Sequence, residues 1–276
     1  MNLTDAQIER YSRQLILPNI GGKGQERLLK ARVLVIGAGG LGSPALLYLA
    51  SAGIGKIGIV DSDKVELNNL QRQIAHSTNT VGMPKVDSAK KTLNAINPEI
   101  EIITYNLRIT SANIMDIIKD YDIVVDGSDN FPTRFLVNDA CVLAKKPLSH
   151  GGIFRFDGQA ITILPGESAC YRCLFPEPPP PGLVPSCQEA GILGVVAGII
   201  GTIQANEVLK YILGTGDLLT GRLLIFNALD SSFRQVKVTK DPNCPVCGKN
   251  PSVTKLIDYE LFCQVKPMST AGGSDG

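Results

Sequence analysis

Short apolar runs alternate with helix-like segments between residues 33 and 149. The runs are rich in β-branched residues, which is typical of buried strands, and they lie at 33–36, 57–61, 100–105 and 122–126. The segments between them predict helices at 43–52, 84–96, 114–119 and 132–145. Regular alternation of strands and helices indicates a parallel sheet with right-handed crossovers.

The pattern changes after residue 150. Apolar runs at 153–156 and 159–164 flank Asp157-Gly158, which predicts an antiparallel hairpin with a tight turn at that dipeptide. Further along, the sequence predicts an exposed proline-rich loop at 177–185, a long buried helix from about 190 to 213, and strands at 223–227 and 233–238. An antiparallel extension of the parallel sheet is therefore expected.

Composition narrows the class of protein. The net charge of +1 argues against nucleic acid or an anionic membrane as the main partner. The apolar run 190–203 has 14 residues, too few to cross a bilayer, and the first residues lack the pattern of a signal peptide. We therefore expect a cytoplasmic protein, in which the seven cysteines serve as thiols or metal ligands rather than disulfides.

The segment 37–42, Gly-Ala-Gly-Gly-Leu-Gly, follows a predicted strand and precedes a predicted helix. Glycines at 37, 39, 40 and 42 allow a tight turn and close approach of the backbone to phosphate, at a helix N-terminus. Asp61 ends the next strand, where a carboxylate can accept hydrogen bonds from ribose hydroxyls. These features predict a nucleotide site in a Rossmann-like α/β fold, with helices on both faces of a mainly parallel sheet.

Two cations help to distinguish the nucleotide. Arg72 and Lys85 follow Asp61. A triphosphate gains more from fixed cations than a dinucleotide pyrophosphate does, because the pyrophosphate is held mostly by backbone amides. The simpler interpretation of both residues is solvated charge at helix ends, and in isolation that interpretation is favoured.

Several motifs in order make the chain similar to the MoeB/ThiF family, the bacterial relatives of the ubiquitin-activating enzyme. They are Arg10-Tyr11-Ser12-Arg13-Gln14, the glycine loop, 68–73 (Asn-Asn-Leu-Gln-Arg-Gln), Lys85, Ser128-Asp129-Asn130 with Arg134, Cys170-Tyr171-Arg172-Cys173, the segment around Cys187, and 244–248 (Cys-Pro-Val-Cys-Gly). The resemblance covers about residues 7–263. It implies one extended adenylation domain at 1–263, with a nucleotide-binding part at about 30–150, an antiparallel and zinc part at about 151–263, and a disordered tail at 264–276.

The resemblance also implies an activity and partners. Such an enzyme uses ATP and Mg²⁺ to adenylate the C-terminal Gly-Gly carboxylate of a small ubiquitin-like sulfur-carrier protein, releasing pyrophosphate. A separate sulfur donor, a desulfurase or a rhodanese, would then supply the sulfur for a thiocarboxylate. The pathway is left open between molybdopterin, thiamine, tRNA thiolation and another thiolated product.

Residue roles follow from the same resemblance. Arg72 and Lys85 would bind phosphates, Asp129 would bind Mg²⁺, and Arg13 would reach the nucleotide of the partner subunit in a homodimer. The other expected nucleotide contacts are Asn68, Asn69, Leu70, Gln71 and Asn130. A helix N-cap ahead of Pro132 is the simpler interpretation of the segment 129–130, and it is compatible with metal binding.

The cysteines form two Cys-x-x-Cys pairs, Cys170 with Cys173 and Cys244 with Cys247. Two such pairs favour a structural Zn²⁺ in a knuckle with four thiolate ligands and no open position for catalysis. Cys187 lies close to the start of a predicted helix, and by resemblance it is a candidate for a covalent intermediate; structural and functional interpretations carry equal weight.

The other candidate groups have structural interpretations. Cys141 is expected in the core, and both histidines, His76 and His150, as hydrogen-bonded structural imidazoles. Two competing functions are an NAD-dependent oxidoreductase, which lacks an evident acid–base set, and a non-catalytic scaffold that binds nucleotide and carrier.

Overall fold

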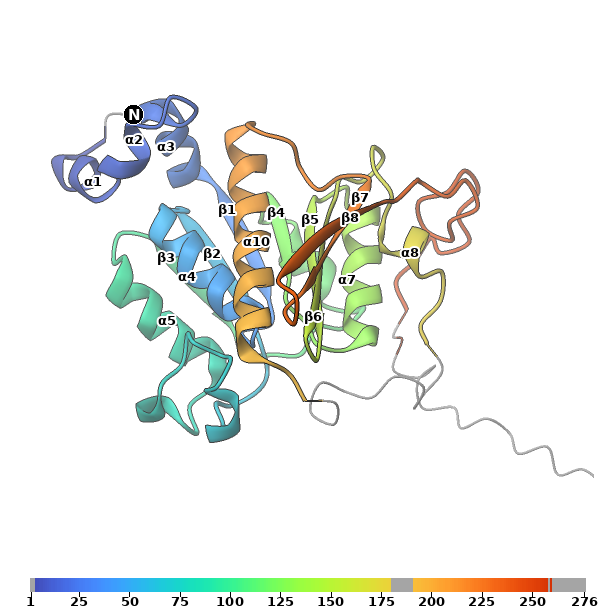
Figure 1. Cartoon of the computed structure of the whole chain (residues 1–276), viewed down its shortest axis with the longest axis horizontal. Helices are drawn as coiled ribbons and strands as arrows, with labels where there is room; N and C mark the ends of the chain where they lie inside the picture. The colour runs from blue at the N-terminus through green and yellow to red at the C-terminus, as the bar shows by residue number, and fades with distance from the viewer. Residues whose placement is uncertain (1–2, 180–190, 258, 260–276) are drawn as a thin grey trace, which may run out of the picture.

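The computed structural model describes residues 3–179, 191–257 and 259, and a single eight-stranded sheet runs through them (Figure 1). The strand order is β3-β2-β1-β4-β5-β6-β7-β8. The parallel strands are β1 (Arg32–Ile36), β2 (Lys56–Val60), β3 (Glu101–Tyr105), β4 (Ile123–Asp126) and β5 (Leu148–Phe154). The antiparallel strands are β6 (Asp157–Ile163), β7 (Arg222–Asn227) and β8 (Ser232–Lys237). The predicted fold class is confirmed.

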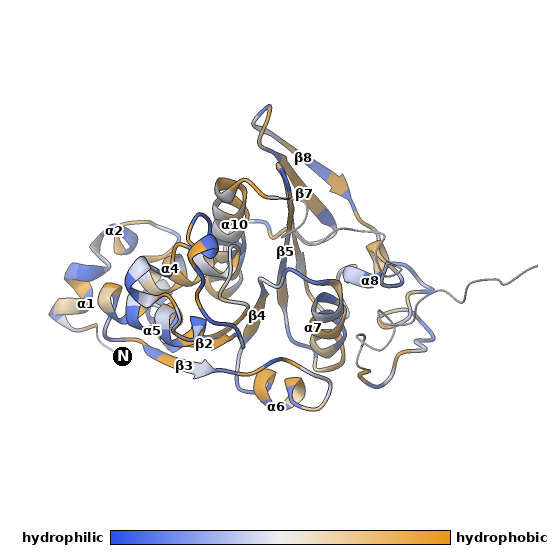
Figure 2. Ribbon diagram, turned by 90° about the horizontal axis from the view of Figure 1, so that it is seen from below, coloured by the Kyte–Doolittle hydropathy of each residue, from blue (hydrophilic) through white to orange (hydrophobic). Residues whose placement is uncertain are grey.

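Helices cover both faces of the parallel part (Figure 2). On one face α4 (Gly42–Ala52), α5 (Lys85–Ile96) and α10 (Gly194–Leu213) pack on strand residues such as Val33 and Val35. On the other face α6 (Ile114–Ile118) and α7 (Phe131–Leu143) pack on their neighbours Leu34 and Ile36. Successive residues of a strand point to opposite faces, so a strand buried on both sides must be apolar throughout. This is why the central strands β1, β2 and β4 are mostly apolar in the sequence.

The remaining helical elements are short or lie at the amino end. They are α1 (Asp5–Arg10), α2 (Ser12–Leu15), α3 (Gly21–Lys30), α8 (Tyr171–Leu174) and the 3₁₀ turns η1 (Leu67–Asn69) and η2 (Thr78–Thr80). In the described part of the chain, no helix has both the length and the apolar character that a membrane span requires.

The β5–β6 hairpin differs from its prediction. Asp157 pairs with Phe154 and belongs to β6, and the turn consists of Arg155 and Phe156, with Arg155 at a φ of 52°. Gly158 is required elsewhere, because a Cβ at this position would lie 2.3 Å from a side-chain carbon of Ile200 on α10. The Asp-Gly dipeptide therefore allows close packing of a helix rather than a turn.

Helix α10 joins the two parts of the sheet. A Cβ on its Gly201 would lie 2.2 Å from the Leu41 carbonyl oxygen in the glycine loop. The Gln204 side-chain amide donates hydrogen bonds to the backbone carbonyls of Asp126 in β4, at 2.7 Å, and Ser149 in β5, at 3.1 Å. The helix begins at Gly194, so the predicted start near 190 is too early. Residues 191–193 are not helical, because Ile192 forms a β-bridge with Arg155 and the Leu193 amide donates to the Arg155 carbonyl. Most of the proline-rich loop, Cys187 and the tail 264–276 lie outside the described residues.

Candidate active site

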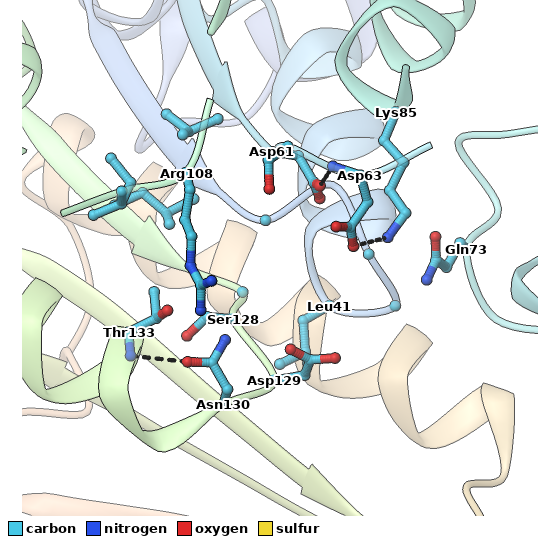
Figure 3. Close-up of a pocket in the computed structure, with 18 of the residues that line it drawn as sticks. Leu41, Asp61, Asp63, Gln73, Lys85, Arg108, Ser128, Asp129, Asn130 and Thr133 are labelled. Atoms are coloured by element: carbon cyan, nitrogen blue, oxygen red, sulfur yellow. Dashed lines mark hydrogen bonds and ion pairs between the residues drawn. The ribbon is translucent and has the colours of Figure 1, made fainter. Parts of the chain in front are cut away.

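A cavity of about 370 Å³ lies at the carboxyl ends of β1, β2 and β4 (Figure 3). Ligands of open parallel sheets bind at this edge, where the order of strands reverses around the first strand. The segments that line it are far apart in the sequence: the glycine loop, the turn after β2, the residues after η1 with the start of α5, the segment after β3, and the turn after β4. Ile153 and Ile192 complete the lining. Predicted site residues at its surface are Gly37, Gly39, Gly40, Asp61, Arg72, Lys85, Asp129 and Asn130.

The glycine loop is closed so tightly that side chains are excluded. A Cβ on Gly42 would lie 1.8 Å from the Gly37 carbonyl oxygen, and Gly37 has a φ of 91°. Gly42 is also the first residue of α4, so the positive end of an eleven-residue helix faces the cavity. The loop therefore presents backbone amides and a helix N-terminus to an anion.

Asp61 anchors the loop from β2. Its carboxylate accepts hydrogen bonds from the amides of Ala38, at 2.8 Å, and Asp63, at 2.9 Å. Burial raises the pKa of Asp61 above its ordinary value, although Lys85 and the two amides oppose this. A carboxylate has about four lone-pair positions, so two remain for ribose hydroxyls.

Lys85 and Asp63 form an ion pair across the cavity wall, with Lys85 Nζ 2.8 Å from Asp63 Oδ2. The lysine side chain is only 8% exposed, whereas the aspartate side chain is 67% exposed. Asp63 can therefore turn into solvent when a stronger anion approaches Lys85. The buried lysine stem fixes its ammonium group at the cavity surface.

The segment around Arg72 is only partly in the cavity. Arg72 donates a 3.2 Å hydrogen bond to the Asn68 carbonyl, and Gln73 beside it also lines the wall. The residues at 68–71 are absent from that wall. The side chains of Asn68 and Asn69 hydrogen-bond each other instead, at 2.6 Å, which stabilises the turn that carries Arg72.

The turn after β4 places Asp129 and Asn130 at the exposed rim (Figure 3). Asn130 Oδ1 accepts a 2.9 Å hydrogen bond from the Thr133 amide, so Asn130 is the N-cap of α7. Arg134 is buried and donates to the Ser128 carbonyl at 3.3 Å, which holds the backbone immediately before Asp129. Asp129 lines the cavity and is exposed, so its carboxylate could hold a divalent metal ion.

Sequence reasoning did not assign Asp63 or Arg108 to the site. Figure 3 shows Arg108, from the segment after β3, with its guanidinium pointing toward Ser128 and Asn130. A cation three residues beyond the predicted strand end at 105 was the available signal. Three cationic side chains therefore line the cavity in the part of the chain that the structure describes: Arg72, Lys85 and Arg108.

A second chamber of about 410 Å³ adjoins the first, and Asp129, Asn130 and Ile153 line both. Its wall is mainly apolar, with Phe131, Phe154, Tyr171 and Phe175 among the lining residues. The chamber can therefore receive an extended, weakly polar chain whose end meets the nucleotide cavity near Asp129.

Within its own chain, Arg13 lies near the end of α4 that is opposite the glycine loop. The neighbouring Gln14 side chain donates to the carbonyl of Ala52, at the last residue of α4. Because α4 begins at the glycine loop and has 11 residues, its ends are about 16 Å apart. Arg13 is exposed there and cannot serve the cavity of its own chain as placed.

The four predicted zinc ligands converge. Cys170 Sγ lies 3.6 Å from Cys244 Sγ, Cys173 Sγ lies 3.4 Å from Cys247 Sγ, and all four sulfurs fall within 4.8 Å of one another. Tetrahedral Zn²⁺ with thiolates at about 2.3 Å requires sulfurs about 3.8 Å apart. The amide of Asp241 also donates to Cys173 Sγ, at 3.4 Å, as expected for a thiolate. The donor set fits a closed structural zinc site.

Cys141 is fully buried, and burial raises the pKa of its thiol well above the ordinary value, which suits an inert core residue. His76 is hydrogen-bonded on both sides of its ring, to Ser88 Oγ at 2.9 Å and to the Ala38 carbonyl at 2.8 Å. It supports the glycine loop from behind.

Comparison with known proteins identifies the family. Residues 11–246 match the model of the ThiF family. The sulfur carrier protein adenylyltransferase of Thermus thermophilus is 52% identical over 96% of this chain and 100% of its own length. Adenylyltransferase and sulfurtransferase MOCS3 of Culex quinquefasciatus is also 52% identical over 96% of this chain, which spans 60% of that relative.

The solved structures agree with this assignment. The crystal structure of Escherichia coli MccB with ATP superposes with a TM-score of 0.75 at 25% identity, covering 86% of this chain and 74% of that one. Its complex with the MccA-N7isoAsn peptide gives a TM-score of 0.77, also at 25% identity, over 90% and 76%. The resemblance inferred from the motifs is thereby confirmed, and the chain belongs to the ThiF family.

Proposed function

We propose that this chain is an ATP-dependent adenylyltransferase that activates the C-terminal Gly-Gly carboxylate of a small ubiquitin-like sulfur-carrier protein. The observation that carries the proposal is the junction at Asp129. There, a cavity lined by three cations adjoins a mainly apolar chamber of about 410 Å³, with Asp129 in the wall of both. Membership of the ThiF family and the name of the Thermus relative support the same reaction.

In this reaction a carboxylate oxygen of the tail attacks the α-phosphorus of ATP. The bond from that phosphorus to the bridging oxygen breaks, and pyrophosphate leaves with the electron pair. Two anions must approach each other, so the site has to neutralise charge and align the attack. The glycine-loop amides, Arg72 and Lys85 bind the phosphates, and Asp61 accepts the ribose hydroxyls.

The residues at the cavity also fit Mg²⁺. Asp129 supplies an exposed carboxylate at the junction, as Mg²⁺ sites with phosphate ligands require. When bound, the ion would neutralise the departing pyrophosphate. The separate Zn²⁺ site of Cys170, Cys173, Cys244 and Cys247 has no position for a substrate and serves stability.

Two partners complete the proposal. A second copy of the chain supplies Arg13 to each cavity. In its own chain Arg13 is next to Gln14, which contacts the end of α4, a helix about 16 Å long, opposite the glycine loop. A desulfurase or a rhodanese supplies sulfur to the acyl-adenylate afterwards. Cys187, outside the described residues, keeps its candidate role as the covalent acceptor.

Exchange of labelled pyrophosphate into ATP tests the reaction. Exchange should require both Mg²⁺ and a carrier that ends in Gly-Gly, and a carrier lacking the final glycine should not support it. Asp129→Asn should lower the rate by about tenfold or more, since loss of one contact worth 1.4 kcal/mol has that effect. Asp116→Asn, an exposed aspartate on α6, is the matched control and should leave the rate unchanged. Carrier-independent nucleotide binding with no exchange would instead favour a scaffold.

A further inference from the structure

A buried polar cluster lies beneath the turn that carries Asp129. Asp126, the last residue of β4, is fully buried, and its carboxylate accepts three hydrogen bonds. Oδ1 accepts from the Ser128 amide at 3.0 Å and from the Ser128 hydroxyl at 2.6 Å. Oδ2 accepts from His150 Nδ1 at 2.8 Å. The cluster thus joins β5 to the residue immediately before Asp129.

His150 has no evident structural reason to be polar. Its side chain is 2% exposed and packs against the Tyr171 ring, with centroids 4.6 Å apart. Among the described residues, its Nε2 has no hydrogen-bond partner. A buried polar atom without a partner is costly, so an apolar residue would suit this core better unless the other ring nitrogen is needed.

The other nitrogen fixes the orientation of Asp126. Burial by itself would raise the pKa of Asp126, but the hydrogen bonds from His150 and Ser128 hold that pKa below its ordinary value. An ionised carboxylate only accepts, so Nδ1 is the protonated ring nitrogen. Without this donor, Asp126 Oδ2 would be a buried anionic oxygen with no partner, and the carboxylate would be free to rotate away from Ser128.

The cluster acts on the cavity through backbone. Arg134 holds the Ser128 carbonyl from one side while Asp126 holds the Ser128 amide from the other. Gly127 also lies against the glycine loop, because a Cβ on it would be 3.0 Å from the Gly42 nitrogen. The position of this turn therefore sets where Asp129 stands relative to bound phosphates.

We propose that His150 is a positioning residue for adenylation, acting through Asp126 to hold the Ser128–Asp129 segment where the Mg²⁺-bound nucleotide requires it. The proposal rests on the proposed function, because it assigns Asp129 to the metal-bound nucleotide. His150 touches no substrate. Its effect should appear in the mobility of the turn and in the metal-dependent part of nucleotide affinity.

Two variants separate this role from simple packing. His150→Leu keeps the volume and removes the donor, whereas His150→Asn keeps a donor near the position of Nδ1. In His150→Leu, the Ser128 amide should exchange hydrogen about tenfold faster, since one hydrogen bond to a charged group is lost. Affinity for a non-hydrolysable ATP analogue should fall about tenfold with Mg²⁺ present and remain unchanged without it. His150→Asn should restore both values.

Equal loss of affinity with and without Mg²⁺, or unchanged Ser128 exchange, would overturn the proposal. If His150→Leu does not fold, Ser128→Ala removes the hydroxyl bond to the same carboxylate and should weaken binding of the analogue only with Mg²⁺; no change would be equally decisive. Neither readout needs the carrier. Absence of pyrophosphate exchange in the wild type would therefore refute the proposed function, while the effect of His150→Leu on amide exchange and analogue affinity could still be interpreted.

Discussion

Replacing Lys85 by methionine separates nucleotide binding from stability. Methionine keeps the length and the apolar volume of the buried stem, so packing at the start of α5 should survive. The Asp63 side chain, which loses its ion-pair partner, is 67% exposed and can be solvated by water. A partly exposed ion pair contributes at most about 1 kcal/mol to the free energy of unfolding. The melting temperature should therefore change little.

The effect on nucleotide binding should be much larger. The ammonium group at the cavity wall would make a charge-assisted hydrogen bond to phosphate, worth about 1.5–3 kcal/mol. Each 1.4 kcal/mol is a factor of ten, so affinity for ATP should fall about 10- to 150-fold. Lys85 also opposes the burial that raises the pKa of Asp61, so its removal raises that pKa further.

Calorimetric titration with an ATP analogue and thermal unfolding measure the two quantities. The matched control is Lys64→Met, because Lys64 is an exposed lysine on the neighbouring segment and is not part of the cavity wall. Asp63→Asn removes the competing carboxylate and should leave affinity equal or tighter. If Lys85→Met lowers the melting temperature by several degrees while affinity stays within a factor of two, Lys85 is only a structural ion pair and the assignment is wrong.

Three further outcomes are expected. Cys244→Ser should release zinc and lower the melting temperature, because structural Zn²⁺ in thiolate sites contributes about 10–16 kcal/mol of binding free energy; elemental analysis finding no zinc in the wild type would remove the basis of this expectation. Mixing inactive Arg13→Ala and Asp129→Ala subunits should restore activity toward half of the wild-type value in each mixed dimer, because one of its two sites then carries neither change. If activity does not return after subunit exchange has been verified, Arg13 acts within its own chain or takes no part in the reaction. Burial lowers the pKa of His76, so the unfolded chain takes up a proton there first, and the free energy of unfolding should fall as pH drops below about 6.5, by at most about 1.4 kcal/mol per pH unit. Urea unfolding at pH 7.5 and 5.5 should show that the free energy of unfolding depends less on pH in His76→Gln than in the wild type. An identical pH dependence in both proteins would exclude His76 as its source.

Most of the parallel sheet was predictable, because burial of a strand on both faces produces a continuous run of apolar residues in the sequence. The central strands β1, β2 and β4 had to be mostly apolar, and each helix between strands had a visible start or stop, such as Gly53 with its φ of 85°. The first part of β5, residues 148–152, was not predicted as a strand, because Ser149, His150 and two glycines interrupt its apolar pattern. The glycine loop and the cysteine pairs were equally readable, since their spacing reflects local geometry. The β5–β6 turn was wrong because Asp-Gly has two physical uses, and only the position of α10 decides between them.

Part of the site could not be predicted because it depends on strand order. Asp126 and His150 are adjacent only because β4 pairs with β5, and nothing near either residue in the sequence indicates this. His150 was accordingly expected to be an ordinary structural imidazole. Arg108 is similar, since an isolated arginine after a strand is usually solvated, and only the folded chain brings it into the cavity wall. Arg13 and Asp129 were identified through family resemblance rather than spacing, and Arg72 was noticed as a cation that the resemblance then assigned to phosphate. The roles of all three stay predictions.

The path of α10 limits how this protein can be divided or recombined. This helix follows the antiparallel hairpin in the chain, yet it fills the space beside the glycine loop and binds the backbone of β4 and β5. A fragment ending near residue 150 would carry every phosphate-binding segment but would expose the apolar surface that α10 covers, and it should aggregate when expressed alone. A chimaera designed to accept a different carrier must therefore keep α10 with the parent parallel sheet.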